Sequence, residues 1–193
     1  MSKLYFRYGT VGSAKTLNLL AVAHNYRQQN KNVIVMQPAI DTRFGIGVVK
    51  SRTGLQTKAD LIIREDTDID SELRLKEIAQ DIHCIIVDEC QFLPKLIIEQ
   101  LFRIVVQYKI PVICYGLKTN FQSELFEGSK RLLELADSIE EVKTTCFFCN
   151  SKALFSLKLQ DGRAVFTGKE VELGADEKYR PCCKSCYIDH KNQ

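Results

Sequence analysis

The chain has 193 residues, of which 45% are hydrophobic and 26% charged, enough for one globular domain or for one domain with a small appendage. Its 27 basic and 24 acidic side chains are mixed along the chain, which excludes a nucleic-acid-binding arm of like charge. Its apolar stretches are shorter than the roughly 20 residues of a membrane-spanning helix, and its first residues lead into a strand-like segment rather than a signal peptide. We therefore expect a cytoplasmic protein with no membrane or nucleic-acid partner.

The first part of the chain has the pattern of a strand, a tight loop, a helix and a second strand. Apolar runs at residues 4–8 and 33–36 predict the strands, and a further short strand is expected at residues 61–63. Between the first two strands, helical spacing is shown by Leu17, Leu20, Ala21 and His24.

The middle of the chain continues this alternation. A helix is predicted at residues 70–80, followed by a strand at 84–87 whose continuous apolar run indicates burial on both faces. A helix with Pro94 in its first turn precedes another buried strand at 112–115, and its inner side is predicted to carry Leu96, Ile97, Leu101, Ile104 and Val105. Strands and helices in alternation predict a mainly parallel sheet with helices on both faces, an α/β domain over residues 1–143.

The composition changes after residue 143, and residues 144–193 form a predicted second, smaller unit. Two strand-like segments at 154–159 and 163–167 flank Asp161-Gly162, a two-residue hairpin turn signal. Five of the 8 cysteines of the chain lie in this last quarter. In a reducing compartment such crowding indicates metal binding rather than disulfides.

The loop after the first strand resembles a phosphate-binding loop. Such a loop needs backbone N–H groups at a helix start, a lysine for the β- and γ-phosphates and a hydroxyl for Mg²⁺. The usual pattern has glycine before the lysine, whereas this chain has Ala14, whose Cβ would crowd the phosphate or strain the backbone. The alternative is an ordinary helix-entry loop with a solvated lysine. The predicted nucleotide-binding residues are Gly9, Thr10, Val11, Gly12, Ser13, Ala14, Lys15 and Thr16.

Asp88 and Glu89 follow directly after the buried strand at 84–87. At this place one carboxylate can reach Mg²⁺ while a neighbouring one accepts a proton from the attacking group. Because adjacent strand residues point to opposite sides, the two carboxylates share a site only if a turn begins at Glu89. The alternative is a strand that ends in two solvated acids.

Two C-x₂-C pairs, at Cys146/Cys149 and Cys183/Cys186, are separated by 33 residues that contain the predicted hairpin. Four thiolates at this spacing fit a closed, tetrahedral structural Zn²⁺ site. Cys182 in place of Cys183 would give a C-x₃-C spacing that zinc also accepts. The metal would fold a segment too small to have a sufficient core of its own. Free or disulfide-paired cysteines are the alternative.

With these features in order, the sequence resembles the zinc-containing thymidine kinases from Leu4 to about His190. The resemblance implies a RecA-like P-loop core, a zinc-stabilised lasso over the nucleoside, a homotetramer and feedback inhibition by dTTP. It also implies transfer of the γ-phosphate of ATP to the 5′-hydroxyl of thymidine. The sequence segments on which the resemblance rests are residues 4–6, 41–45, 51–55, 87–93, 115–121 and 174–179.

The resemblance also assigns roles to individual residues. Lys15 and Thr16 would bind the triphosphate and Mg²⁺, Asp88 would join the metal shell, and Glu89 would be the catalytic base. Cys90 and Gln91 would lie by the nucleotide phosphates. Arg43 is a candidate for stabilising charge on the transferred group, the alternative being a surface arginine paired with Asp41. Phe121 would pack against thymine and Tyr179 would lie in the lasso, where the alternative for both is core packing.

Two other classes of protein remain open from the sequence. A zinc-ribbon, nucleic-acid-dependent ATPase would also combine a phosphate loop with four cysteines, but it predicts a basic face with interleaved aromatic residues. A degenerate nucleotide-binding paralogue without catalysis would be supported by Ala14 alone.

Overall fold

The centre of the computed structural model is a six-stranded sheet in the order β5-β2-β6-β7-β1-β8, and all of its pairings are parallel. The structure describes residues 1–168 and 178–192. The part of the resemblance at 174–177 therefore lies outside the described residues. The strands are β1 (Leu4–Tyr8), β2 (Val33–Pro38), β5 (Leu61–Ile63), β6 (Cys84–Val87), β7 (Val112–Gly116) and β8 (Ser138–Glu141).

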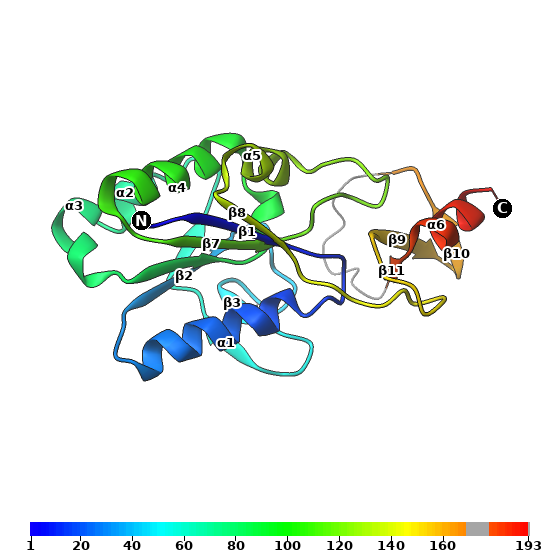
Figure 1. The fold of residues 1–193 in the computed structure, drawn as a ribbon, viewed down its shortest axis with the longest axis horizontal. Helices are drawn as coiled ribbons and strands as arrows, with labels where there is room; N and C mark the ends of the chain where they lie inside the picture. The colour runs from blue at the N-terminus through cyan, green and yellow to red at the C-terminus, as the bar shows by residue number, and fades with distance from the viewer. Residues whose placement is uncertain (169–177, 193) are drawn as a thin grey trace.

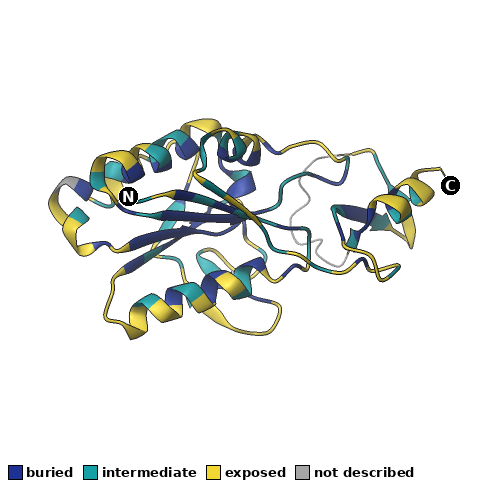
Figure 2. Cartoon of the chain, in the orientation of Figure 1, coloured by how far each residue is buried: buried dark blue, intermediate teal, exposed yellow. Residues whose placement is uncertain are grey.

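Helices cover both faces of this sheet. In Figure 1, α1 (Lys15–Gln28) lies on one side of the strands, and α4 (Lys95–Tyr108) with α5 (Glu127–Leu135) lies on the other. Every residue of β6 and β7 is buried, as expected of strands covered on both faces. Burial accordingly concentrates in the central strands, while the outward helix faces are exposed (Figure 2). The predicted α/β fold, a mainly parallel sheet with helices on both faces, is confirmed.

The helix predicted at residues 70–80 is wrong as one continuous element. The segment instead forms two short helices and a 3₁₀ turn, because Arg74 has a left-handed backbone (φ 46°) that interrupts the α-helical hydrogen bonding. The pieces are α2 (Ile69–Glu72), α3 (Leu75–Ile78) and η1 (Ala79–Asp81).

The inner faces predicted for two helices need correction. Leu96 is 67% exposed, and α4 buries Ile98 together with the other four predicted positions. On α1, Leu19 and Ala23 are buried beside Leu20, while Ala21 and His24 are exposed. Both segments have apolar side chains at neighbouring positions, so spacing alone left the rotation of each helix about its axis undetermined.

The last part of the chain forms a small antiparallel sheet in the order β10-β9-β11 with one helix, beyond the end of the main sheet at which β1 leads into α1 (Figure 1). The Asp161-Gly162 hairpin turn is confirmed: both residues have positive φ (49° and 77°), as a type I′ turn requires. The elements are β9 (Phe155–Gln160), β10 (Arg163–Val165), β11 (Tyr179–Cys182) and α6 (Lys184–Lys191).

Two further short elements complete the fold around the main sheet. The strands β3 (Val48–Lys50) and β4 (Gln56–Lys58) pair as an antiparallel hairpin. The 3₁₀ helix η2 (Cys90–Phe92) connects β6 to α4. Among the described residues, the helices are too short or too polar to traverse a lipid bilayer.

Candidate active site

The phosphate-binding loop joins the end of β1 to the start of α1. The N–H of Gly9 donates to the Gly116 carbonyl of β7 (3.2 Å), and Ser13 N–H donates to Thr10 O (3.2 Å). A side chain at Gly9 would overlap Ser13 and the Val142 carbonyl, so only glycine fits there. The loop is thus held to the sheet at its first residue and opens α1 at its last.

Ala14 adopts the left-handed conformation at φ 62°, ψ 27°. Ala14 was expected either to crowd the phosphate or to strain the backbone, and its backbone has the geometry for which glycine is usually chosen. For an L-residue with a Cβ this conformation costs roughly 1–2 kcal/mol. The loop therefore keeps the phosphate-loop shape at a cost in stability.

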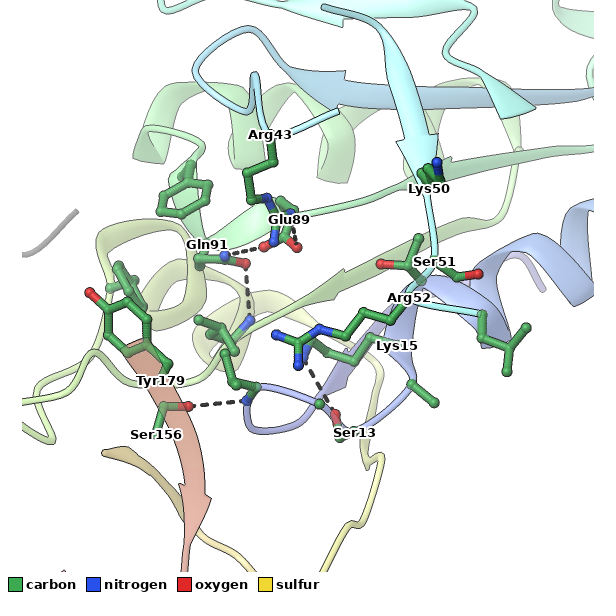
Figure 3. Close-up of a pocket in the computed structure, with 18 of the residues that line it drawn as sticks. Ser13, Lys15, Arg43, Lys50, Ser51, Arg52, Glu89, Gln91, Ser156 and Tyr179 are labelled. Atoms are coloured by element: carbon green, nitrogen blue, oxygen red, sulfur yellow. Dashed lines mark hydrogen bonds and ion pairs between the residues drawn. The ribbon is translucent and has the colours of Figure 1, made fainter. Parts of the chain in front are cut away.

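Lys15 is 8% exposed and its ammonium lies inside the loop. It donates to Thr10 O (2.8 Å) and to Ser13 Oγ (3.4 Å), as Figure 3 shows for the second bond. Burial lowers its pKa, while the carboxylates of Glu89 and Asp88 act in the opposite direction. The lysine is therefore held by loop oxygens rather than solvated at the surface.

Asp88 lies behind Thr16, whose hydroxyl donates to Asp88 Oδ2 (3.0 Å). Burial, followed by the neighbouring charge of Glu89, raises the pKa of Asp88 to about 7. Its other oxygen, Oδ1, is buried without a hydrogen-bond partner in the described part of the chain. An unpaired buried carboxylate oxygen beside a threonine hydroxyl fits a divalent cation of the kind that accompanies ATP.

Glu89 has a left-handed backbone (φ 47°) at the start of η2, which is the turn that the acidic pair required. The two neighbouring carboxylates are close enough for the charge of Glu89 to act on Asp88, although only Glu89 lines the cavity. Glu89 Oε1 accepts from Arg43 (2.5 Å) and Oε2 accepts from Gln91 Nε2 (2.5 Å). Both oxygens are therefore held by donors at the edge of the cavity (Figure 3).

Arg43 bridges two carboxylates rather than lying free at the surface. It donates to Asp41 through Nε (2.7 Å) and through its terminal nitrogen (2.9 Å), in addition to the bond to Glu89. Asp41 is 3% exposed and also accepts from Gln37 (2.8 Å). Although burial acts to raise it, the hydrogen bond and the charge of Arg43 lower the pKa of Asp41. The arginine is thereby fixed beside the base.

Gln91 links Glu89 to the end of β7, because its Oε1 accepts from Leu117 N–H (3.0 Å). A Cβ at Gly116 would lie 2.5 Å from Gln91 Oε1 and 2.7 Å from Cys90 Sγ. Cys90 itself is fully buried and packs in the hydrophobic core, not in the cavity wall.

A cavity of about 250 Å³ joins these groups to the C-terminal unit. The phosphate loop from Val11 to Thr16 lines one side, whereas Gly9, Thr10 and Asp88 lie outside the lining. Glu89, Gln91 and Arg43 line it as well, and Phe121 and Tyr179 lie on the side of the C-terminal unit. The structure thus gathers phosphate-binding, acid–base and aromatic residues in one cavity.

Phe121 is 1% exposed, and its ring centroid lies 6.4 Å from that of Tyr179. Its carbonyl accepts from Tyr187 OH of α6 (2.8 Å). The Lys158 ammonium lies 4.7 Å from the ring centroid of Phe121. Phe121 is therefore both packed and cavity-lining, so core packing and contact with a ligand do not exclude each other.

The four thiols of Cys146, Cys149, Cys183 and Cys186 all lie within 4.8 Å of one another, and Cys182 is not part of the group. The Cys149 and Cys183 sulfurs are 3.6 Å apart, close to the separation expected around a tetrahedral Zn²⁺. The cluster therefore fits zinc through the four predicted residues.

Several cavity residues had no role in the sequence analysis. The turn of the β3–β4 hairpin brings Lys50, Ser51, Arg52 and Thr53 to the cavity, near the phosphate loop (Figure 3). The string 51–55 contributed to the resemblance but has no spacing that indicates a ligand. Ser156 of β9 also lines the cavity. A single serine in a strand gives no sequence pattern from which its hydrogen bond to Val11, 145 residues away, could be predicted.

Comparisons with known proteins agree with this geometry. The family model described as thymidine kinase matches residues 2–187. The thymidine kinase of Streptococcus gordonii is 44% identical over 97% of this chain and 97% of its own length, and that of Lactiplantibacillus plantarum is 46% identical over 97% and 96%. Among solved structures, a Pif1 helicase from Candida albicans matches with a TM-score of 0.45 at 13% identity, covering 73% of this chain and 36% of that one. With a family match over nearly its whole length, the chain belongs to the thymidine kinase family.

Proposed function

We propose that the protein is an ATP:thymidine 5′-phosphotransferase that produces dTMP for DNA precursor synthesis. The observation that carries this proposal is the single cavity lined by the phosphate loop, by Glu89 and by the aromatic pair Phe121 and Tyr179. A triphosphate at the loop and a nucleoside at the aromatic pair would bring donor and acceptor together in the cavity that holds the base.

On the donor side, Lys15 and the loop N–H groups would bind the β- and γ-phosphates. Thr16 and Asp88, with its unpaired Oδ1, would hold Mg²⁺. Bound Mg²⁺ neutralises the charge that develops on the phosphate oxygens. Ala14 keeps the loop in the required left-handed turn, so its presence is compatible with ATP binding.

On the acceptor side, Glu89 would take the proton of the 5′-hydroxyl as this oxygen attacks the γ-phosphorus. Arg43 and Gln91 orient its two oxygens. The guanidinium of Arg43, fixed by Asp41, places a positive charge next to the base, where it would stabilise the transferred group. Phe121 would pack against the thymine ring and Tyr179 would border it.

The zinc site, the assembly and the regulation belong to the same proposal. Cys146, Cys149, Cys183 and Cys186 would bind a structural Zn²⁺ that orders the unit from which Tyr179 comes. A homotetramer and feedback inhibition by dTTP are predictions from the resemblance and await measurement.

The test is a transfer assay with purified protein, Mg²⁺ and γ-labelled ATP. Thymidine, deoxycytidine and uridine are offered separately, and label is followed into the nucleoside monophosphate. We expect label in dTMP alone. Transfer to none of the three, from protein that binds ATP and zinc, would contradict the proposal and favour a degenerate nucleotide-binding protein.

A further inference from the structure

Strand β9 presents two different faces to the molecule. Phe155, Leu157 and Leu159 alternate along the strand and belong to the small core that contains the cysteine cluster. Because neighbouring strand residues point to opposite sides, Ser156 and Lys158 face away from this core. Ser156 lines the cavity, and the Lys158 ammonium lies over the ring of Phe121. One strand therefore contacts the cysteine cluster on one side and the active site on the other.

Ser156 makes a direct contact with the phosphate loop. Its Oγ accepts a hydrogen bond from the backbone N–H of Val11 (3.1 Å), and Figure 3 shows this bond across the foot of the cavity. Ser156 is only 4% exposed, and the bond itself is partly buried. The strand position of Ser156 is fixed by pairing with Pro181 of β11.

The other hydrogen bonds of the phosphate loop differ from the Ser156–Val11 bond in where their partners lie. Gly9 is tied to β7, and Thr10 is tied to Ser13 and to the Lys15 side chain. Val11, which follows Thr10, donates to the C-terminal unit rather than to the main sheet or to the loop itself. The following residue, Gly12, has φ 74° and allows the loop to turn back toward α1. Ser156 thus anchors the tip of the loop from outside the P-loop domain.

We propose that Ser156 is a positioning residue of the phosphate loop, through which the cysteine-bearing unit sets the order of the ATP site. This inference rests on the proposed function, because it assumes that the loop binds the triphosphate. The hydroxyl does not touch the reacting atoms. Its effect is exerted on Val11, whose N–H direction fixes the path of the loop before the residues that would bind phosphate.

The size of the effect follows from the net value of one hydrogen bond. A neutral, partly buried bond of this kind contributes about 1 kcal/mol, which corresponds to roughly a fivefold change in an equilibrium. Ser156→Ala should therefore weaken ATP binding about fivefold. Because the substitution leaves Glu89, Arg43 and Phe121 in place, the loss should appear in the KM for ATP more than in kcat.

The experiment compares Ser156→Ala with the zinc-loaded wild type by hydrogen exchange of the segment 9–15 and by the Kd for a non-hydrolysable ATP analogue. Ser156→Thr, which keeps a hydroxyl and suits a strand, should restore both values. Ser138→Ala on β8, whose hydroxyl bonds to Glu140 near the surface, is the control. Zinc content and thermal unfolding are measured on every variant.

We expect loop exchange to accelerate about fivefold in Ser156→Ala, with normal zinc content and unchanged exchange in β7. Unchanged loop exchange and unchanged ATP affinity would overturn the proposal. If the alanine variant does not fold, Ser156→Cys replaces it, because cysteine has a similar volume to serine and its sulfur is only a weak hydrogen-bond acceptor. Loop exchange and ATP affinity of this variant then test the proposal in the same way. The exchange comparison needs no substrate, so a failure of thymidine phosphorylation would count against the proposed function and not against the Ser156–Val11 anchor.

Discussion

Glu89 lies where β6 ends and η2 begins, and its left-handed backbone turns its carboxylate toward the cavity instead of the sheet. Arg43 and Gln91 each donate to one of its two oxygens. Glutamine has the same size and can keep the bond from Arg43 through its oxygen, while its NH₂ group then faces the Gln91 amide. Glu89→Gln should bind ATP and thymidine nearly normally, because the phosphate loop and the aromatic pair are unchanged, while turnover falls by about 10² to 10⁴. Steady-state kinetics with separate binding titrations would measure both quantities.

The matched control for this substitution is Glu65→Gln, in the exposed loop after β5. It removes the same charge far from the cavity and should leave turnover unchanged. A Glu89→Gln enzyme with full turnover would remove Glu89 from the role of base.

Ala14 offers a test of backbone strain at a single residue. Its left-handed conformation costs roughly 1–2 kcal/mol, whereas the extra freedom of glycine in the unfolded chain costs about 0.5–1 kcal/mol. Ala14→Gly should therefore stabilise the protein by about 0.5–1 kcal/mol, which raises the Tm by about 2 °C for a chain of this size. Thermal unfolding would show it.

The same replacement in a regular helix should have the opposite sign. Ala21→Gly, on the exposed side of α1, loses about 0.5–1 kcal/mol because its backbone is already relaxed. A lowered Tm for both variants would show that Ala14 carries no strain in solution.

Single residues were predictable from the sequence where a local pattern determines them, as for Lys15, Thr16 and the four cysteines. Their long-range partners were not. Arg43 was expected either to act on the transferred group or to pair with Asp41, and in the structure it pairs with both Asp41 and Glu89, 46 residues away. No spacing rule connects positions so far apart, because the fold alone brings them together.

At the scale of elements, the end of β7 closely approaches η2 at Gly116. Gly116 leaves room for Gln91 Oε1 and Cys90 Sγ, which lie 2.5 and 2.7 Å from where a Cβ would be. Gly116→Ala should cost about 1–3 kcal/mol by overpacking. It should also lower kcat, because a displaced Gln91 no longer holds Glu89. Thermal unfolding and kinetics at a temperature where the variant is folded would separate the two effects.

Gly162→Ala is the control for this close approach. Gly162 lies in the β9–β10 turn at φ 77° with open space around it, so alanine there brings backbone strain without a collision. It should lower the Tm by an amount that corresponds to about 1 kcal/mol and leave kcat unchanged. Equal kcat values for the two variants would argue against the link from Gly116 to Glu89.

Helices and strands were predictable where burial gives the segment a clear pattern of apolar residues. The strands of the sheet centre, β6 and β7, were expected because both faces are apolar. The strand β8 was not, since Ser138–Glu141 is a polar edge strand paired only with β1. The three-residue strands β3 and β4 are too short for a periodic signal, so the hairpin that brings Arg52 to the cavity was not predicted.

At the scale of the whole molecule, the active site is shared between two parts of the chain. The main sheet contributes the phosphate loop and Glu89, and the C-terminal unit contributes Tyr179 and Ser156. Among its described residues, 144–168 and 178–192, the hydrophobic core cluster of that unit has five buried members, three of them cysteines, namely Cys146, Leu157, Cys182, Cys183 and Tyr187. So small a core contributes little stability without a metal, so order in the cavity should depend on zinc.

Removal of zinc by a chelator should therefore loosen the C-terminal unit while the parallel sheet stays folded. We expect trypsin to cleave within residues 144–192 first, and ATP affinity to fall as the anchor on Val11 is lost. A matched pair of variants identifies the ligand. Cys183→Ser should lose zinc although its hydroxyl can still cap α6, whereas Cys182→Ser should keep zinc because its sulfur lies outside the cluster.

Zinc content by atomic spectroscopy and limited proteolysis of both variants would decide between the two cysteines. Loss of zinc from Cys182→Ser alone would reassign the fourth ligand. Protease resistance of 144–192 that persists after complete zinc removal would show that the small core is sufficient. The metal would then have no structural role, and the dependence of the ATP site on zinc would fail with it, because β9 would hold Ser156 against the loop unaided.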